Sequence, residues 1–154
     1  MSTKQEWGNA CWYLFHSLAS NIINDSPKLI QELLDNIILI CNNLPCPDCS
    51  YHASKTLKTL QKSKLKTKDD LIKVLWEFHN TVNKRLHKKT FSKDEYNELY
   101  SRANLINIYK HFMSVMNKKN GNEKAMIYTL SRRNALKKLS SFVITHSSHF
   151  IITK

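Results

Sequence analysis

The chain has 154 residues and a formal charge of +12 at pH 7, and it contains only two Gly, three Pro and four Cys. This length suits one domain with a buried core and an appended tail. The scarcity of Gly and Pro excludes a fold rich in hairpin turns or a Gly-rich phosphate loop, and favours a mostly helical protein. The positive charge fits nucleic acid, an acidic partner or a polyanionic cofactor, or serves solubility alone.

Two further patterns limit where the protein works. The four cysteines are too few and too closely grouped for the disulfide framework of a small secreted domain. No segment after Met1 resembles a secretion signal, and the longest apolar run, Ile37 to Cys41, is too short to span a bilayer. We therefore expect a soluble protein made in the cytosol.

The first two predicted helices lie before residue 44. Residues 5 to 23 carry apolar side chains at helical spacing, and Trp12 and His16 lie four residues apart on a neighbouring stripe. That pair fits either a half-buried surface contact or part of a site. Ser26 and Pro27 begin a second helix that extends to about Asn43. Its apolar surface is wide enough to serve both the core and a second subunit.

A Cys-Pro-Asp-Cys sequence follows, from Cys46 to Cys49. Pro47 suits the first turn of a new helix, so Cys46 is expected near its N-cap and Cys49 about one turn in. Cysteines at this spacing can form a disulfide, and a helix N-terminus stabilises a thiolate, so the pair is suited to thiol–disulfide exchange. The alternative is a metal knuckle with His52 as a third ligand, but a second ligand pair at suitable spacing is absent.

Another predicted helix, residues 68 to 89, begins with a capping-box-like sequence at Thr67. Trp76, His79, Asn80 and Asn83 fall on one face of it. Buried imidazoles and carboxamides need hydrogen-bond partners, so this face suits a flat heteroaromatic ligand better than a plain core. A solvated face with one stray Trp is the simpler alternative.

The last part of the chain is basic and lacks cysteine. Ser92 opens a full capping box, from which we predict one helix through about Met116. We predict a break at residues 117 to 124, moderate helical pattern from Ala125 to Ile144, and an irregular end. The predicted domains are therefore residues 1–116 and a basic extension, residues 117–154. That extension could contact nucleic acid through non-specific phosphate contacts.

The order of these features resembles the Erv/ALR family of FAD-dependent sulfhydryl oxidases over about Trp7 to Tyr100. The family resemblance implies an all-α fold, a four-helix bundle with a short fifth helix that binds FAD at one end and is usually a homodimer. The residues that it assigns to FAD come from three predicted helices: Trp12, His16, His52, Trp76, His79, Asn80, Val82, Asn83, Lys84, Arg85 and Lys88. Aromatic and amide groups suit the rings, and cations suit the pyrophosphate.

The resemblance also implies a mechanism. Cys46 would exchange with a substrate dithiol, Cys49 would address the flavin, and O₂ would be reduced to H₂O₂. No cysteine follows Cys49, so neither a C-terminal shuttle pair nor a clamping disulfide after that point is expected. Protein dithiols or a separate thioredoxin-like carrier would then deliver electrons directly to Cys46.

The sequence looks most like the short family members of large cytoplasmic DNA viruses, of the African swine fever virus type. This implies a place in the host cytoplasm, at viral assembly sites or in the virion. Two other functions stay open at this point. One is a zinc-binding helical module that uses Cys46, Cys49, His52 and His79; the other is a basic helical protein that binds nucleic acid.

Overall fold

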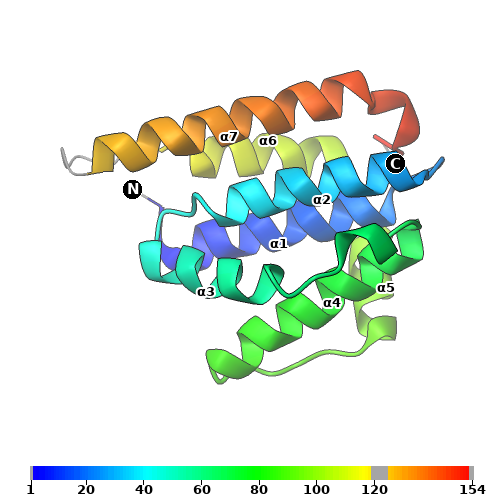
Figure 1. Ribbon diagram of the computed structural model, residues 1–154, viewed down its shortest axis with the longest axis horizontal. Helices are drawn as coiled ribbons and strands as arrows, with labels where there is room; N and C mark the ends of the chain where they lie inside the picture. The colour runs from blue at the N-terminus through cyan, green and yellow to red at the C-terminus, as the bar shows by residue number, and fades with distance from the viewer. Residues whose placement is uncertain (1, 119–124, 153–154) are drawn as a thin grey trace.

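The computed structural model describes residues 2–118 and 125–152, and it is helical throughout (Figure 1). Within these residues the chain forms no strand, only a single antiparallel bridge between Ile22 and Phe150. The all-α prediction is confirmed. The helices are α1 (Lys4–Ser20), α2 (Pro27–Cys41), α3 (Pro47–Leu57), α4 (Lys68–Arg85), α5 (Lys93–Tyr100), α6 (Leu105–Met116) and α7 (Ala125–Thr145), with short 3-10 turns at Lys62–Lys64 and Ser147–His149.

Side-chain caps set the starts of the helices that the sequence predicted. The Ser26 hydroxyl accepts a hydrogen bond from the backbone N–H of Leu29, and Pro27 occupies the first position of α2. Full capping boxes begin α4 at Thr67 and α5 at Ser92. These three starts are confirmed.

The single long helix predicted from Ser92 to about Met116 is wrong. The structure has two helices there, because α5 ends at Tyr100 and α6 begins at Leu105. The side chain of Asn104 accepts a hydrogen bond from the backbone N–H of Asn107 at 3.1 Å, so Asn104 caps a new helix. Neither Gly nor Pro marks this break, and the helical spacing of apolar residues continues across it in the sequence, so the sequence did not predict it.

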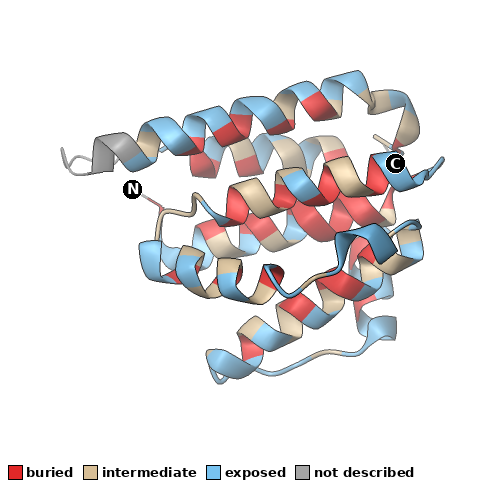
Figure 2. Cartoon of the chain, viewed as in Figure 1, coloured by how far each residue is buried: buried red, intermediate tan, exposed pale blue. Residues whose placement is uncertain are grey.

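The helices form three layers (Figure 1). The middle layer consists of α1 and α2, which lie beneath α6 and α7 and above α3, α4 and α5. Buried residues are concentrated in the middle layer, whereas the outer surface of α7 is exposed (Figure 2). The four long helices α1 to α4 and the eight-residue α5 match the bundle with a short fifth helix that the resemblance implied. The predicted placement of FAD at one end of it stays a prediction.

The C-terminal helix adds to the same core. Its buried apolar side chains are Ala135, Leu136, Leu139 and Phe142, and Phe150 beyond it is also buried. The helical pattern predicted for this region is therefore confirmed. The predicted break at residues 117 to 124 lies mostly outside the described residues, and the division into domains at residue 116 stays a prediction. No described helix has the length and hydropathy needed to cross a membrane.

Candidate functional site

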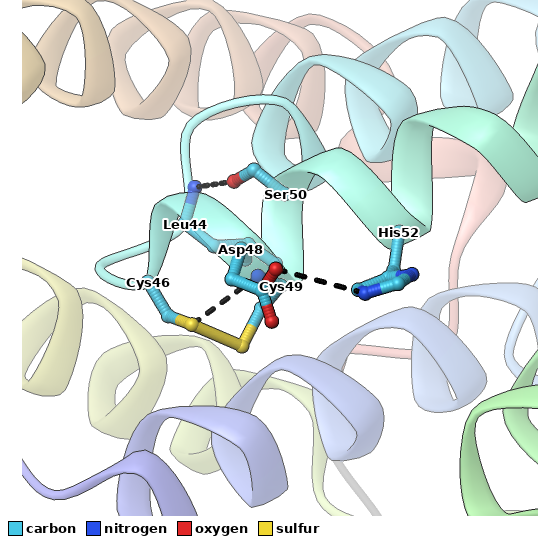
Figure 3. The surroundings of a disulfide bond; sticks show 6 residues. All are labelled: Leu44, Cys46, Asp48, Cys49, Ser50 and His52. Atoms are coloured by element: carbon cyan, nitrogen blue, oxygen red, sulfur yellow. Dashed lines mark hydrogen bonds and ion pairs between the residues drawn. A yellow bond between two sulfur atoms is a disulfide. The ribbon is translucent and has the colours of Figure 1, made fainter. Parts of the chain in front are cut away.

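The two cysteines of the Cys-Pro-Asp-Cys sequence form a disulfide at the start of α3, with their Cα atoms 5.2 Å apart (Figure 3). Cys46 is the N-cap residue, and its sulfur accepts a hydrogen bond from the backbone N–H of Cys49 at 3.2 Å. Pro47 fills the first helical position, as predicted. The Ser50 hydroxyl accepts a hydrogen bond from the N–H of Leu44, which fixes the loop before the disulfide. The helix N-terminus therefore faces the sulfur atoms and favours their thiolate form.

The two sulfur-bearing residues differ in exposure. Cys46 is partly exposed, whereas Cys49 is buried and retains only 7% of its accessible surface. An outside thiol therefore reaches Cys46 more easily than Cys49. Cys49 instead lines an open groove of about 590 Å³ that runs between α1, α3 and α4.

The groove has an apolar wall and a cationic end. Its apolar and aromatic lining includes Trp12, Phe78 and Val82, and its cations are Lys4, Arg85 and Lys88. Lys4 lies in the first turn of α1, Arg85 is the last residue of α4, and Lys88 follows α4 by three residues. Aromatic surface at one place and positive charge at another suit a ligand with a flat ring system and phosphate groups.

A stack of aromatic rings forms the inner wall. The Trp12 indole lies parallel to the His79 imidazole, with the ring centroids 3.9 Å apart and the planes 9° apart. Nε2 of His16 lies 2.8 Å from Nδ1 of His79, so these two atoms share one hydrogen bond. Trp12 also stacks on His16 at 5.6 Å. Trp12 is half-buried and lines the groove, whereas His16 is fully buried behind it. The half-buried surface contact considered for this pair therefore describes Trp12 but not His16.

Burial keeps both imidazoles neutral. It lowers the pKa of His79 to about 4, with a further contribution from the nearby Lys88 ammonium. Burial also lowers the pKa of His16 well below its ordinary value, and His79 adds to that effect. Nδ1 of His16 is buried and has no hydrogen-bond partner. A lone pair is less costly to leave unpaired than an N–H, so Nε2 of His16 donates to His79 in the favoured tautomer. His79 then carries its own proton on Nε2.

Trp76 and Asn80 lie on α4 but do not line this groove. The Trp76 indole N–H donates to the carbonyl oxygen of Phe91 at 2.8 Å. The Asn80 carboxamide donates to the same carbonyl at 2.9 Å and accepts from the Phe91 N–H at 3.1 Å. These polar groups therefore find partners in the chain itself. Together with Lys84 they line a second open groove of about 520 Å³.

The segment after α4 is fixed by this network. Its anchor is Phe91, whose ring packs edge-on against His79 with centroids 4.8 Å apart. The Asn83 side chain donates to the carbonyl oxygen of Lys89 at 3.2 Å. At the end of α4, His87 adopts a left-handed conformation, with a φ of 56°. Lys88 then donates its N–H to the carbonyl of Asn83, which completes a Schellman motif and directs the chain past the groove.

His52 lies on α3 away from the groove lining, with its Nε2 3.6 Å from an oxygen of Asp48 (Figure 3). The metal knuckle considered for Cys46, Cys49 and His52 gains no support from this arrangement, because the two sulfur atoms are joined. Within the residues that the structure describes, no three His, Cys, Asp or Glu side chains are grouped to hold a metal ion.

The structure therefore divides the predicted residues into two sets. The set that lines the groove beside Cys49 is Trp12, His79, Val82, Asn83, Arg85 and Lys88, and the set that does not is His16, His52, Trp76, Asn80 and Lys84. The sequence prediction missed lining residues on α1, which are Lys4, Gln5, Trp7, Gly8, Asn9, Cys11 and Phe15. Five of them, Lys4, Gln5, Gly8, Asn9 and Phe15, follow Trp12 in steps of three or four residues, and that spacing was their signal. Trp7 and Cys11 lie four residues apart on the neighbouring stripe. Nothing in the sequence around Phe91 indicated that this residue lies beside the site.

Comparison with known proteins decides the family. The model of the Erv1 / Alr family matches residues 9–101, which are more than half of the chain. The chain belongs to the Erv1/Alr family. This match begins within α1, continues through α5 and includes both cysteines of the disulfide. The last two helices, α6 and α7, lie beyond it.

Individual members of the family are similar over the same length. The chain is 35% identical over 99 residues to the FAD-linked sulfhydryl oxidase of African swine fever virus (isolate Pig/Kenya/KEN-50/1950), an alignment that covers 63% of this chain and 82% of that relative. It is 31% identical over 91 residues to the FAD-linked sulfhydryl oxidase ERV2 of Saccharomyces cerevisiae, which covers 57% of this chain and 45% of the yeast protein. No solved structure matches the chain at a significant level.

Proposed function

We propose that this Erv1/Alr chain is an FAD-dependent thiol oxidase, which converts two thiols and O₂ into a disulfide and H₂O₂. The observation that carries the proposal is the position of the Cys46–Cys49 disulfide, which is partly open to solvent at Cys46 and borders an aromatic, cationic groove at Cys49. Relatives that bear the name FAD-linked sulfhydryl oxidase support the cofactor and the reaction.

The residues of the groove fit FAD by their chemistry. Trp12, Phe78 and Val82 supply the apolar surface that a flat ring system needs. The favoured tautomer of the histidine pair offers the Nε2–H of His79 as a hydrogen-bond donor beside that surface. Arg85 and Lys88 supply charge for a pyrophosphate. When bound there, FAD would accept two electrons and pass them to O₂.

The chain's own part in the reaction begins at Cys46. A substrate thiolate attacks the Cys46 sulfur, forms a mixed disulfide, and breaks the Cys46–Cys49 bond, so that Cys49 leaves as a thiolate. The N-terminus of α3 stabilises that charge. The second substrate thiolate then attacks the substrate sulfur of the mixed disulfide, which releases an oxidised substrate and leaves Cys46 and Cys49 with two electrons. Cys49, on the groove wall, is the thiol placed to pass them on.

The partners follow from this chemistry. The substrates are dithiols presented by proteins or by a separate thioredoxin-like carrier that reaches Cys46, and O₂ is the final acceptor. We place the reaction in the host cytoplasm, at viral assembly sites or in the virion, because the chain is 35% identical to a relative from African swine fever virus. Contact with nucleic acid through residues 117–154 stays a prediction.

The test is oxygen consumption by flavin-loaded protein with dithiothreitol as the substrate. Cys49→Ser and Cys46→Ser should each lower the rate at least about a hundredfold, because either change removes the exchangeable disulfide. Lys55→Ala, an exposed change on the same helix, is the matched control and should keep the native rate. Normal oxygen consumption by Cys49→Ser would disprove the proposal.

A further inference from the structure

Most of the positive charge of the chain lies beyond α5, in a part that contributes no residue to the groove beside Cys49. From residue 101 to residue 154 the sequence has ten Lys or Arg and one acidic residue, Glu123, which lies outside the described residues. The first 100 residues have 14 basic and 11 acidic residues. Charges are therefore nearly balanced where the family model matches, and the surplus belongs to the part of the chain that forms α6 and α7.

Helix α7 carries part of this surplus on its outer surface. Its apolar side chains pack against the core, so the opposite side of the helix faces solvent (Figure 2). The exposed polar residues of that side recur every three or four positions, and they are Arg133, Asn134, Lys137, Lys138 and Ser141. We call these five residues the basic stripe.

No carboxylate of the described residues neutralises the basic stripe. Among the Lys and Arg side chains that the structure describes beyond α5, Lys118 alone forms an ion pair, with Glu6 at 3.9 Å. Arg133 and Lys137 lie at positions i and i+4 of α7, where like charges destabilise a helix. Charge that neither forms an ion pair nor stabilises its own helix is available to an anion outside the chain.

The chemistry of the basic stripe suits a phosphate backbone. Arg, Lys, Asn and Ser are among the side chains that donate hydrogen bonds to the phosphates of nucleic acids. From Arg133 to Ser141 the stripe extends about 12 Å along α7. A DNA duplex carries one phosphate charge for about every 1.7 Å of its axis, so about seven phosphates lie along that length. The three cations of the stripe therefore have phosphates within reach.

An acidic protein fits this surface less well. A specific protein–protein interface has an apolar core inside a polar rim. The large apolar side chains exposed on the outer side of α7 are Leu130 and Ile144, with exposed fractions of 57% and 73%. They lie about 21 Å apart along the helix, and the basic stripe lies between them. The centre of this surface is therefore charged where a protein partner would need it to be apolar.

We propose that the basic stripe of α7 binds the phosphate backbone of a nucleic acid without reading its sequence. This site is separate from the one proposed for thiol oxidation. No residue of the stripe lines the groove beside Cys49, and α7 lies on the opposite side of the middle layer from α3 and α4 (Figure 1). The proposal therefore does not depend on the oxidase activity, and mutation of the stripe should leave that activity unchanged.

The test is fluorescence anisotropy of labelled DNA and RNA duplexes of about 20 base pairs, titrated with full-length, flavin-loaded protein in about 50 to 200 mM KCl. The stripe variant is Arg133→Gln/Lys137→Gln/Lys138→Gln. The matched control is Lys64→Gln/Lys66→Gln/Lys73→Gln, which removes the same charge from exposed positions before and within α4. At the lowest salt, the stripe variant should raise the Kd at least about tenfold and the control less than about threefold. Three phosphate contacts contribute about −2.7 to the slope of log affinity against log salt for duplex DNA, and the stripe variant should lose that contribution.

Acetylation of lysines in the native protein is a second measurement that needs no variant. A bound duplex should slow acetylation of Lys137 and Lys138 but not of Lys64 and Lys66, as followed by mass spectrometry of peptides. Binding of either duplex through the stripe supports the proposal, and the tighter one identifies the natural class of nucleic acid. Equal loss of affinity in both variants, or equal protection of all four lysines, would overturn it. Displacement of the duplex by poly-glutamate at the same charge concentration would assign the surface to an acidic protein and would also overturn it.

Discussion

Asn80 is the clearest place to test how the segment after α4 is fixed. Its carboxamide makes two hydrogen bonds with the main chain of Phe91, one as donor at 2.9 Å and one as acceptor at 3.1 Å. Asn80→Ala removes both. The Phe91 carbonyl keeps its bond from Trp76, but the Phe91 N–H is left to water.

The magnitude follows from those two bonds. Each is worth about 0.5 to 1.5 kcal/mol net, and Phe91 is only half-buried, so water restores part of the loss. We expect Asn80→Ala to lower the free energy of unfolding by about 1 to 2 kcal/mol. With a urea m-value of about 2 kcal/mol/M, the midpoint should fall by about 0.5 to 1 M.

The assay is urea unfolding followed by circular dichroism, with Thr81→Ala as the matched control. Thr81 is exposed and its hydroxyl bonds only to the Glu77 carbonyl of its own helix at 2.8 Å, so its loss should cost less than about 0.5 kcal/mol. Because Phe91 packs against His79, Asn80→Ala should also raise the pKa of His79 from about 4 toward 6.5. An Asn80→Ala protein as stable as Thr81→Ala would refute this reasoning.

Three further predictions concern other parts of the site. His87→Gly should raise the free energy of unfolding by about 0.5 to 1 kcal/mol in the same urea assay, because glycine adopts the left-handed conformation of His87 without strain. Burial lowers the pKa of His79 from 6.5 to about 4, so the unfolded chain takes up a proton at a higher pH than the folded chain, and the free energy of unfolding should fall as the pH drops from 6.5 to 4. His79→Gln should weaken this fall, and an unchanged dependence of the free energy of unfolding on pH would contradict the account. After mild reduction, iodoacetamide should label Cys46 about tenfold faster than Cys11 or Cys41, because burial raises the pKa of both buried thiols, that of Cys41 to about 12. The labelling rates are measured by mass spectrometry of peptides, and equal rates at the three cysteines would contradict this prediction.

Local chemistry made much of the fold predictable. The capping boxes at Thr67 and Ser92 predict two helix starts from only four consecutive residues each, and the structure confirms both. Cys46 and Pro47 define the start of α3 in the same local way. The break before α6 was missed because its signal, Asn104 as an N-cap, is weak beside a continuous aromatic stripe.

The site was predictable in composition but not in arrangement. The sequence placed Trp76, Asn80 and His79 on one helix face and predicted one ligand for all three. Of these three residues, His79 alone lines the groove beside Cys49. Trp76 and Asn80 instead form hydrogen bonds with Phe91, whose position depends on tertiary packing. Helical spacing specifies a face, but it does not specify which neighbour covers that face.

The measurement that tests the central claim most directly is the visible absorption spectrum of the purified protein, before and after a dithiol is added in air-free buffer. The account predicts a flavin band that bleaches with the dithiol and returns when oxygen is admitted, which would establish the cofactor, the donor and the acceptor together. It also predicts that Cys49→Ser binds flavin but does not bleach. A folded protein that binds no flavin, or a band that the dithiol leaves unchanged in the native chain, would contradict it.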